Sequence, residues 1–143
     1  MSQTYITQAL RREVITRAES RCEYCKALMG MGTDLFAIEH IIPEKAGGLT
    51  ILTNLALACS SCNTFKGSAL TGKDPITEQI MVLFHPRQDG WPKHFLWSDD
   101  ALRIIGITPT GRATVALLRM NQQSLINLRQ LLRDAGLHPP ATQ

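Results

Sequence analysis

The sequence predicts an α+β domain in which a zinc ion holds together a strand, a long loop, a second strand and a helix. Two observations support this prediction. All four cysteines occur in two Cys-x-x-Cys pairs, Cys22–Cys25 and Cys59–Cys62, a spacing typical of structural zinc sites. Between the pairs, two short apolar runs flank a loop with a Gly-Gly pair, as in a hairpin. A chain of 143 residues has a modest core, which a structural metal would reinforce.

The N-terminal segment, residues 7–20, is predicted to form a helix. Leu10, Val14 and Ala18 recur every four residues and share one face. Three basic residues lie off this stripe, namely Arg11, Arg12 and Arg17. They are interpreted as solvated side chains, with contacts to phosphate as the alternative.

The two cysteine pairs are predicted to bind one structural zinc ion. Each Cys-x-x-Cys turn directs two sulfur atoms at one centre, and tetrahedral zinc takes four. Because 33 residues separate Cys25 from Cys59, the metal would bracket an inserted unit. A redox-active pair would need a βαβ context that the sequence does not offer. A secreted protein with two disulfides is the other alternative.

The inserted unit is predicted to be a hairpin followed by a helix. Residues 35–38 and 55–58 read as its strands, and a helical pattern runs from Asn63 to about residue 70. The end of the first strand lies near the start of the second in an antiparallel pair. His40 and Asn54 are therefore expected to face each other across the mouth of the loop.

The C-terminal stretch, residues 73–143, is predicted to be an extension that packs on the core, residues 1–72, as one unit. It lacks metal-ligand spacing and reads as two strands, at 95–97 and 101–107, followed by two helices. Its aromatic residues are expected in the core rather than stacked on bases, namely Trp91, Phe95 and Trp97.

Caps mark the two helices of this extension. Thr108 is a suitable N-cap, with Pro109 at the first helical position. The second helix is predicted to begin after Asn121 as its cap and to end at Gly136.

The candidate chemistry lies between Glu39 and Asn63. A carboxylate beside a histidine suits metal-assisted hydrolysis, in which Glu39 supplies a hard oxygen ligand and His40 accepts a proton from water. Asn63 offers a second oxygen, and two protein oxygens with waters and a phosphate oxygen suit Mg²⁺ or Mn²⁺. Asn54 is predicted to hold the loop backbone so that the imidazole is oriented. Each residue alone would more often be a surface residue or a cap, but their grouping in one hairpin favours function.

These residues resemble the HNH nuclease family, whose ββα-metal fold is also called the His-Me finger. The family pattern is an acid–His pair, a loop with Pro and Gly-Gly, an Asn-Leu strand and Cys-x-x-Cys-Asn-x-x-Lys. The matching positions are Glu39-His40, Pro43, Gly47-Gly48, Asn54-Leu55 and Cys59 to Lys66. The resemblance covers about a third of the chain, and residues 84–121 resemble the segment that follows this motif in small bacterial stand-alone HNH proteins.

The resemblance implies a metal-dependent endonuclease that hydrolyses DNA phosphodiester bonds. His40 would be the general base, Asn54 would orient the loop, and Glu39 and Asn63 would hold a single catalytic ion. The structural zinc would lie remote from this chemistry. In two departures from the family pattern, Glu39 replaces the more frequent aspartate and Asn63 replaces the final histidine, and both changes keep oxygen ligands.

Partners and location follow from charge and hydropathy. The formal charge is +3, and four thiolates with one zinc ion would lower it to about +1. DNA binding must therefore come from local contacts, which we assign to three residues, Lys66, Arg112 and Arg119. The sequence has no apolar run of membrane-spanning length and no signal-peptide pattern, so a cytoplasmic protein without membrane contact is expected. The alternatives are a non-catalytic zinc-ribbon module that binds nucleic acid and a zinc-stapled protein-interaction domain.

Overall fold

The computed structural model describes residues 5–141 and has an α+β fold, as predicted. The N-terminal half consists of α1 (Gln8–Arg17), β1 (Ala37–His40), η1 (Glu44–Ala46), η2 (Leu52–Asn54), β2 (Leu55–Ala58) and α2 (Ser60–Lys66). The C-terminal half consists of β3 (Thr71–Lys73), β4 (Ile80–Val82), α3 (Trp91–His94), β5 (Phe95–Trp97), β6 (Ile104–Gly106), α4 (Pro109–Leu118) and α5 (Gln123–Asp134). None of the described helices is long and apolar enough to cross a membrane.

The central hairpin pairs β1 with β2 antiparallel, with Glu39 opposite Ala56 and His40 opposite Leu55. The second strand has its predicted bounds, but the first begins at Ala37 rather than at Leu35. Leu35 is 82% exposed and lies before the point where β2 offers a hydrogen-bonding partner. The apolar run at residues 35–38 therefore predicted the presence of β1 correctly. The point at which β1 begins is set by its pairing with β2, which starts at Ala37 opposite Ala58.

Helix α2 begins earlier and ends earlier than predicted. Cys59 is its N-cap, and the Sγ atom accepts a hydrogen bond from the backbone N–H of Cys62 at 3.4 Å. The helix ends at Lys66 because Gly67 follows with a φ of 52°, in a region that favours glycine. Residues 71–73, which were not predicted as a strand, form β3 and pair with β4.

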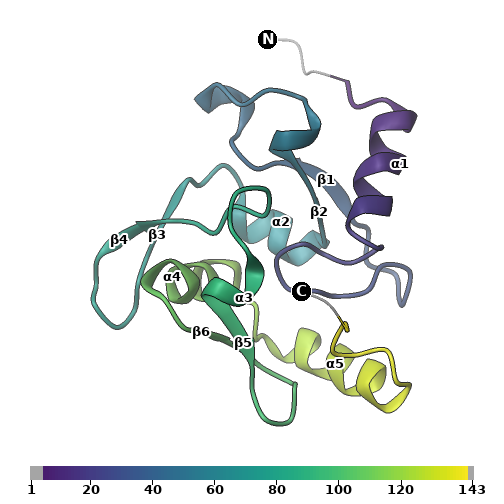
Figure 1. Ribbon diagram of the computed structural model, residues 1–143, viewed down its shortest axis with the longest axis vertical. Helices are drawn as coiled ribbons and strands as arrows, with labels where there is room; N and C mark the ends of the chain where they lie inside the picture. The colour runs from purple at the N-terminus through teal and green to yellow at the C-terminus, as the bar shows by residue number, and fades with distance from the viewer. Residues whose placement is uncertain (1–4, 142–143) are drawn as a thin grey trace.

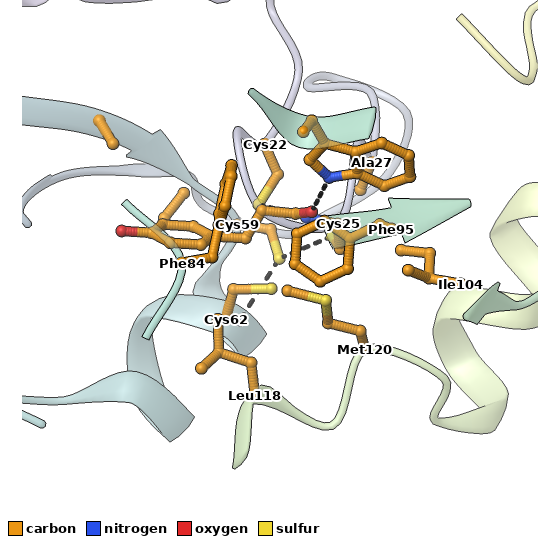
Figure 2. Packing of buried hydrophobic residues seen from close by; sticks show 14 of the residues in the cluster. Cys22, Cys25, Ala27, Cys59, Cys62, Phe84, Phe95, Ile104, Leu118 and Met120 are labelled. Atoms are coloured by element: carbon orange, nitrogen blue, oxygen red, sulfur yellow. Dashed lines mark hydrogen bonds between the residues drawn. The ribbon is translucent and has the colours of Figure 1, made fainter. Parts of the chain in front are cut away.

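Two hydrophobic clusters hold the chain together. Helix α1 covers one face of the hairpin, where Val14 packs against Leu55 and Leu57. A larger cluster surrounds the cysteines and draws on both halves of the chain, including Phe84, Phe95, Ile104, Leu118 and Met120 (Figure 2). In Figure 1 the C-terminal helices α4 and α5 lie below the hairpin in this view, with α4 beside α2. The two segments therefore share one core, while a boundary at residue 72 stays a prediction.

The C-terminal half confirms most of the predicted elements. Strands β5 and β6 pair as a hairpin, and Thr108 Oγ1 caps α4 by accepting a hydrogen bond from Gly111 N–H. The aromatic side chains Trp91 and Phe95 are buried, as expected for core residues.

Asn121 is not the cap of α5, and this prediction was wrong. Gln122 occupies the cap position, and the Asn121 amide instead bonds to both backbone groups of Ile104, each at 2.8 Å. A side-chain amide can pair with a strand backbone as readily as with a helix end, and the packing of β6 beside this turn decides which of the two it does.

Candidate functional site

The four cysteines converge at one buried centre. Their sulfur atoms all lie within 4.8 Å of one another, and the Cys25 and Cys59 Sγ atoms are 3.7 Å apart. Tetrahedral zinc with Zn–S bonds of about 2.3 Å places sulfur atoms about 3.8 Å apart, so the observed spacing fits a zinc ion. The cysteines are free thiols, which argues against the two-disulfide alternative. Figure 2 shows the sulfur atoms enclosed by Phe84, Phe95 and Met120.

The chemistry of these thiols also fits a bound cation. Hydrogen bonds with Cys22 and Cys25 raise the pKa values of Cys59 and Cys62 well above their ordinary values, whereas the pKa of Cys22 is lowered, despite its burial, by hydrogen bonds with the other three cysteines. A zinc ion would stabilise the thiolates. With four protein ligands and no exposure to solvent, such a site leaves no open position for substrate, which is the character of a structural site.

Glu39 lies on the face of β1 that is turned toward α2. Its side chain is buried, the Tyr24 hydroxyl donates a hydrogen bond to Oε1, and Lys66 Nζ lies 3.2 Å from Oε2. Burial raises the pKa of the Glu39 carboxyl, and the charge of Lys66 and the hydrogen bond from Tyr24 oppose this shift. Both carboxylate oxygens therefore already have a protein partner.

His40 is the last residue of β1 and lies opposite Leu55 of β2. Its Nε2 atom lies 2.8 Å from Thr50 Oγ1 and 3.9 Å from Glu44 Oε1. Thr50 belongs to the loop that connects the two strands, so this loop fixes the orientation of the imidazole ring.

Asn54 holds that loop by three hydrogen bonds. Its Oδ1 atom accepts from Ile42 N–H at 2.9 Å, and its Nδ2 atom donates to the carbonyl oxygens of Ile42 at 3.0 Å and Leu49 at 2.9 Å. Gly48 is required here, because a Cβ atom at this position would lie 1.7 Å from the Ile42 oxygen and 2.8 Å from Asn54 Nδ2. The side chain of Asn54 thus ties the start of the loop to its far end.

Three of the predicted site residues, Glu39, His40 and Asn63, line one cavity, whereas Asn54 does not line it. The cavity has a volume of about 260 Å³, and its lining includes Glu39, His40, Glu44 and Asn63. Asn63 lies in α2, and its side chain makes no hydrogen bond to another of the described residues. Carboxylate and amide oxygens are suitable ligands for a hard divalent ion. The donor set therefore fits such an ion, although the ammonium group of Lys66 already neutralises Glu39.

Lys66 is not placed as predicted for a DNA contact. The sequence suggested a helix face shared with Asn63 and open to phosphate. In the structure Lys66 is only 3% exposed, and its ammonium group donates to Glu39 Oε2 and to the Ile41 carbonyl oxygen at 2.9 Å. The packing of α2 against β1 turns this lysine inward, where it is the partner of a buried carboxylate.

The two predicted arginine contacts lie away from this cavity. Arg112 forms a bidentate ion pair with Asp74, with Nε and Nη2 each 2.9 Å from a carboxylate oxygen. Arg119 is exposed and lies over the ring of Phe65, with 4.4 Å between its guanidinium carbon and the ring centroid. Arg119 follows the end of α4 in a left-handed conformation, so the two arginines do not share a helix face.

Sequence reasoning missed three residues of the site. Tyr24 lies between Cys22 and Cys25, so the first cysteine turn, residues 22–25, itself contacts Glu39. Thr50 and Glu44 lie in the loop around His40. No local signal identifies Tyr24, because its contact with Glu39 joins residues 15 positions apart. The sequence shows that Thr50 places a hydroxyl in the loop, but it does not show that this hydroxyl points to His40.

The comparisons with known proteins agree with the motif. Residues 22–69 match the family model described as HNH endonuclease, and this range includes both cysteine pairs and all residues of the cavity named above. Comparisons with curated proteins and with solved structures gave no match.

Proposed function

We propose that the protein is a metal-dependent endonuclease that cleaves DNA, on the premise that residues 22–69 match the family model described as HNH endonuclease. The observation that carries the proposal is the single cavity lined by Glu39, His40 and Asn63. A module that only binds nucleic acid has no need for a carboxylate, a histidine and an amide around one space. The bonds from Asn54 to the loop support the proposal because they hold His40 in place.

His40 acts as the general base in this proposal. Neutral imidazole has one nitrogen that donates and one that accepts. If Nε2–H donates to Thr50 Oγ1, the lone pair lies on Nδ1, which then accepts the proton of the attacking water. The loop held by Asn54 fixes both the tautomer and the direction of that lone pair.

Glu39 and Asn63 are the proposed ligands of the catalytic divalent ion, Mg²⁺ or Mn²⁺. Such an ion, when bound, supplies a Lewis acid for the phosphodiester group. Tyr24 holds Glu39 Oε1, which keeps the carboxylate in one orientation and leaves Oε2 on the side of Lys66. The four-cysteine site has a separate role, which is to hold the hairpin, α2 and Tyr24 in register.

The ion pair between Glu39 and Lys66 favours a second candidate function. A carboxylate that already has an ammonium partner and a phenol donor needs no metal ion. The same zinc-stapled fold without a catalytic ion would be a nucleic-acid-binding module. The two candidates differ in whether the protein cleaves DNA.

A plasmid-nicking assay tests the proposed function. We expect the zinc-loaded protein to convert supercoiled plasmid into nicked or linear DNA when Mg²⁺ or Mn²⁺ is added, and EDTA to stop the reaction. Zinc content measured before and after the EDTA treatment controls for loss of the structural ion. Binding of plasmid without cleavage under any of these conditions would reject the nuclease and leave the binding module.

Two substitutions are expected to change Mn²⁺ affinity in opposite directions. Asn63→Ala removes an oxygen ligand and should weaken Mn²⁺ binding about tenfold, the effect of roughly 1.4 kcal/mol. Lys66→Met removes a competing cation and should strengthen binding. Because Lys66→Met leaves a buried carboxylate unpaired, which costs about 3–5 kcal/mol, its melting temperature should be low without Mn²⁺ and should rise when Mn²⁺ is added.

Calorimetric titration and thermal melts measure these effects without any need for cleavage. Lys45→Met is the matched control, because it removes the same charge from an exposed residue of the neighbouring loop. If both test variants bind Mn²⁺ with the affinity of the wild type, Glu39 and Asn63 are not the ligands of the ion.

A further inference from the structure

A second cavity, of about 250 Å³, lies where the C-terminal end of α1, the first cysteine turn (residues 22–25) with its neighbours, and residues 86–91 meet. We call it the basic cavity, because four cationic side chains line it: Arg17, Arg21, Lys26 and Arg87. Three carboxylates also line it, namely Glu19, Glu23 and Asp89. None of these residues has a role in the proposed cleavage.

The carboxylates of the basic cavity pair with two of its cations, because Glu23 forms ion pairs with Arg87 and with Arg17, the latter at 4.0 Å, and leave Lys26 without a carboxylate partner in the described part of the chain. Glu23 is buried, and its two oxygens accept hydrogen bonds from Arg87 and from the backbone N–H of Leu57, the latter at 2.9 Å. Asp89 Oδ2 accepts from the backbone N–H of His85 at 3.0 Å. Glu19, the third carboxylate, is exposed. Glu23 and Asp89 therefore already have hydrogen-bond donors in the segments that line the cavity.

Two donors of the basic cavity lack a hydrogen-bond partner among the described residues. Arg87 Nη1 is buried and unpaired. The Lys26 ammonium lies over the ring of Trp91, 5.5 Å from its centroid, and makes no hydrogen bond to any described residue. Burial with the charge of Arg17 lowers the pKa of Arg87 to about 10. Arg87 remains protonated at neutral pH, and an anion would offset the cost of burying these groups.

Arg87 also connects the basic cavity to the catalytic loop. It lines a neighbouring cavity of about 480 Å³ together with Gly48 and Asn54, the residues that shape the loop of His40. An anion held by Arg87 would therefore lie next to a cavity that this loop also lines. A DNA strand has a phosphate at every nucleotide, so neighbouring phosphates can occupy neighbouring sites.

We propose that the basic cavity binds a phosphate group, with Lys26 and the free Nη1 of Arg87 as its principal donors. Guanidinium and ammonium groups that converge on a small space are the donors that recognise phosphate oxygens, and the cationic excess excludes a metal ion as the ligand. The source of the phosphate is either the DNA backbone or a free phosphate. The choice of DNA rests on the proposed function, whereas phosphate binding as such does not.

Titration of inorganic phosphate into the zinc-loaded full chain tests this proposal, with calorimetry or ³¹P NMR as the readout. We expect saturable binding of one phosphate per chain and a rise in melting temperature with phosphate concentration. Lys26→Met keeps most of the side chain that packs on Trp91 and should weaken binding at least tenfold. Lys93→Met removes the same charge from an exposed residue outside the cavity and should bind phosphate as the wild type does.

Arg87→Gln provides a second variant, which removes a charge-assisted donor and should also weaken binding at least tenfold. It also leaves Glu23 with only the more distant Arg17, 4.0 Å away, as a cationic partner, so its melting temperature is measured first. If this variant does not fold, Lys26→Met decides the matter. Absence of saturable binding to the wild type, or unchanged affinity in Lys26→Met, would overturn the proposal.

A short DNA duplex in EDTA separates the two sources of phosphate. If the DNA backbone occupies the basic cavity, Lys26→Met should weaken duplex binding and reduce the slope of log K against log salt by about 0.9, and inorganic phosphate should compete. If only free phosphate binding changes, the cavity takes a free phosphate and the DNA assignment fails. His40→Ala should bind inorganic phosphate like the wild type whether or not the nuclease proposal holds, and a loss there would place the phosphate in the catalytic cavity instead.

Discussion

Replacement of His40 by alanine is expected to lower the rate of DNA cleavage by about 10²–10⁴-fold, the usual contribution of a general base. The side chain ends β1 at the mouth of the loop, and its Nε2 atom contacts Thr50. Alanine removes the proton acceptor while the hydrogen bonds from Asn54 to Ile42 and Leu49 continue to hold the loop. The DNA affinity of the variant should stay that of the wild type, because the imidazole does not supply binding energy in this proposal.

A cleavage assay and a gel-shift assay on the same preparation measure both quantities. Thr53→Ala is a suitable control, because Thr53 is exposed in the same loop and does not line the catalytic cavity. Zinc content and melting temperature establish that His40→Ala is folded. Cleavage at the wild-type rate by the folded variant would show that the proposed mechanism is wrong.

Replacement of Cys59 by serine is expected to abolish zinc binding and with it the folded state. All four cysteines are fully buried at the centre of the larger hydrophobic cluster, and Cys59 also caps α2. Structural zinc contributes about 10–16 kcal/mol in zinc-finger peptides, whereas a whole domain is stable by about 5–15 kcal/mol. Loss of one ligand therefore removes a contribution as large as the total stability.

Elemental analysis, circular dichroism and thermal melts measure this effect. Thr64→Ser is the matched control, because it changes an exposed residue of the same helix and should keep the zinc and the wild-type melting temperature. Removal of zinc from the wild type with a strong chelator should unfold it in the same way. A cooperative fold in Cys59→Ser without bound zinc would contradict a structural role for the four cysteines.

The α+β class, the hairpin and several helix ends were predictable because their signals are local. Cys-x-x-Cys spacing, the Thr108-Pro109 helix start and the apolar run of β2 each involve residues a few positions apart. Strand β3 was missed because its three residues, with Gly72 at the centre, have no strand pattern of their own. It forms because β4 lies alongside it and α4 packs against Gly72.

The sequence by itself determined the pairing of the four cysteines and the grouping of Glu39, His40, Asn54 and Asn63 in one hairpin and helix. Only the tertiary structure decided which charged side chains face solvent. Lys66 turns inward to Glu39, 27 positions away, and Arg112 pairs with Asp74, 38 positions away. The sequence around a charged residue does not show whether its side chain is solvated or buried. The free energy cost of burying the charge depends on which segments pack over the side chain and on which oppositely charged partner they place beside it. Both are set by residues far away in the sequence.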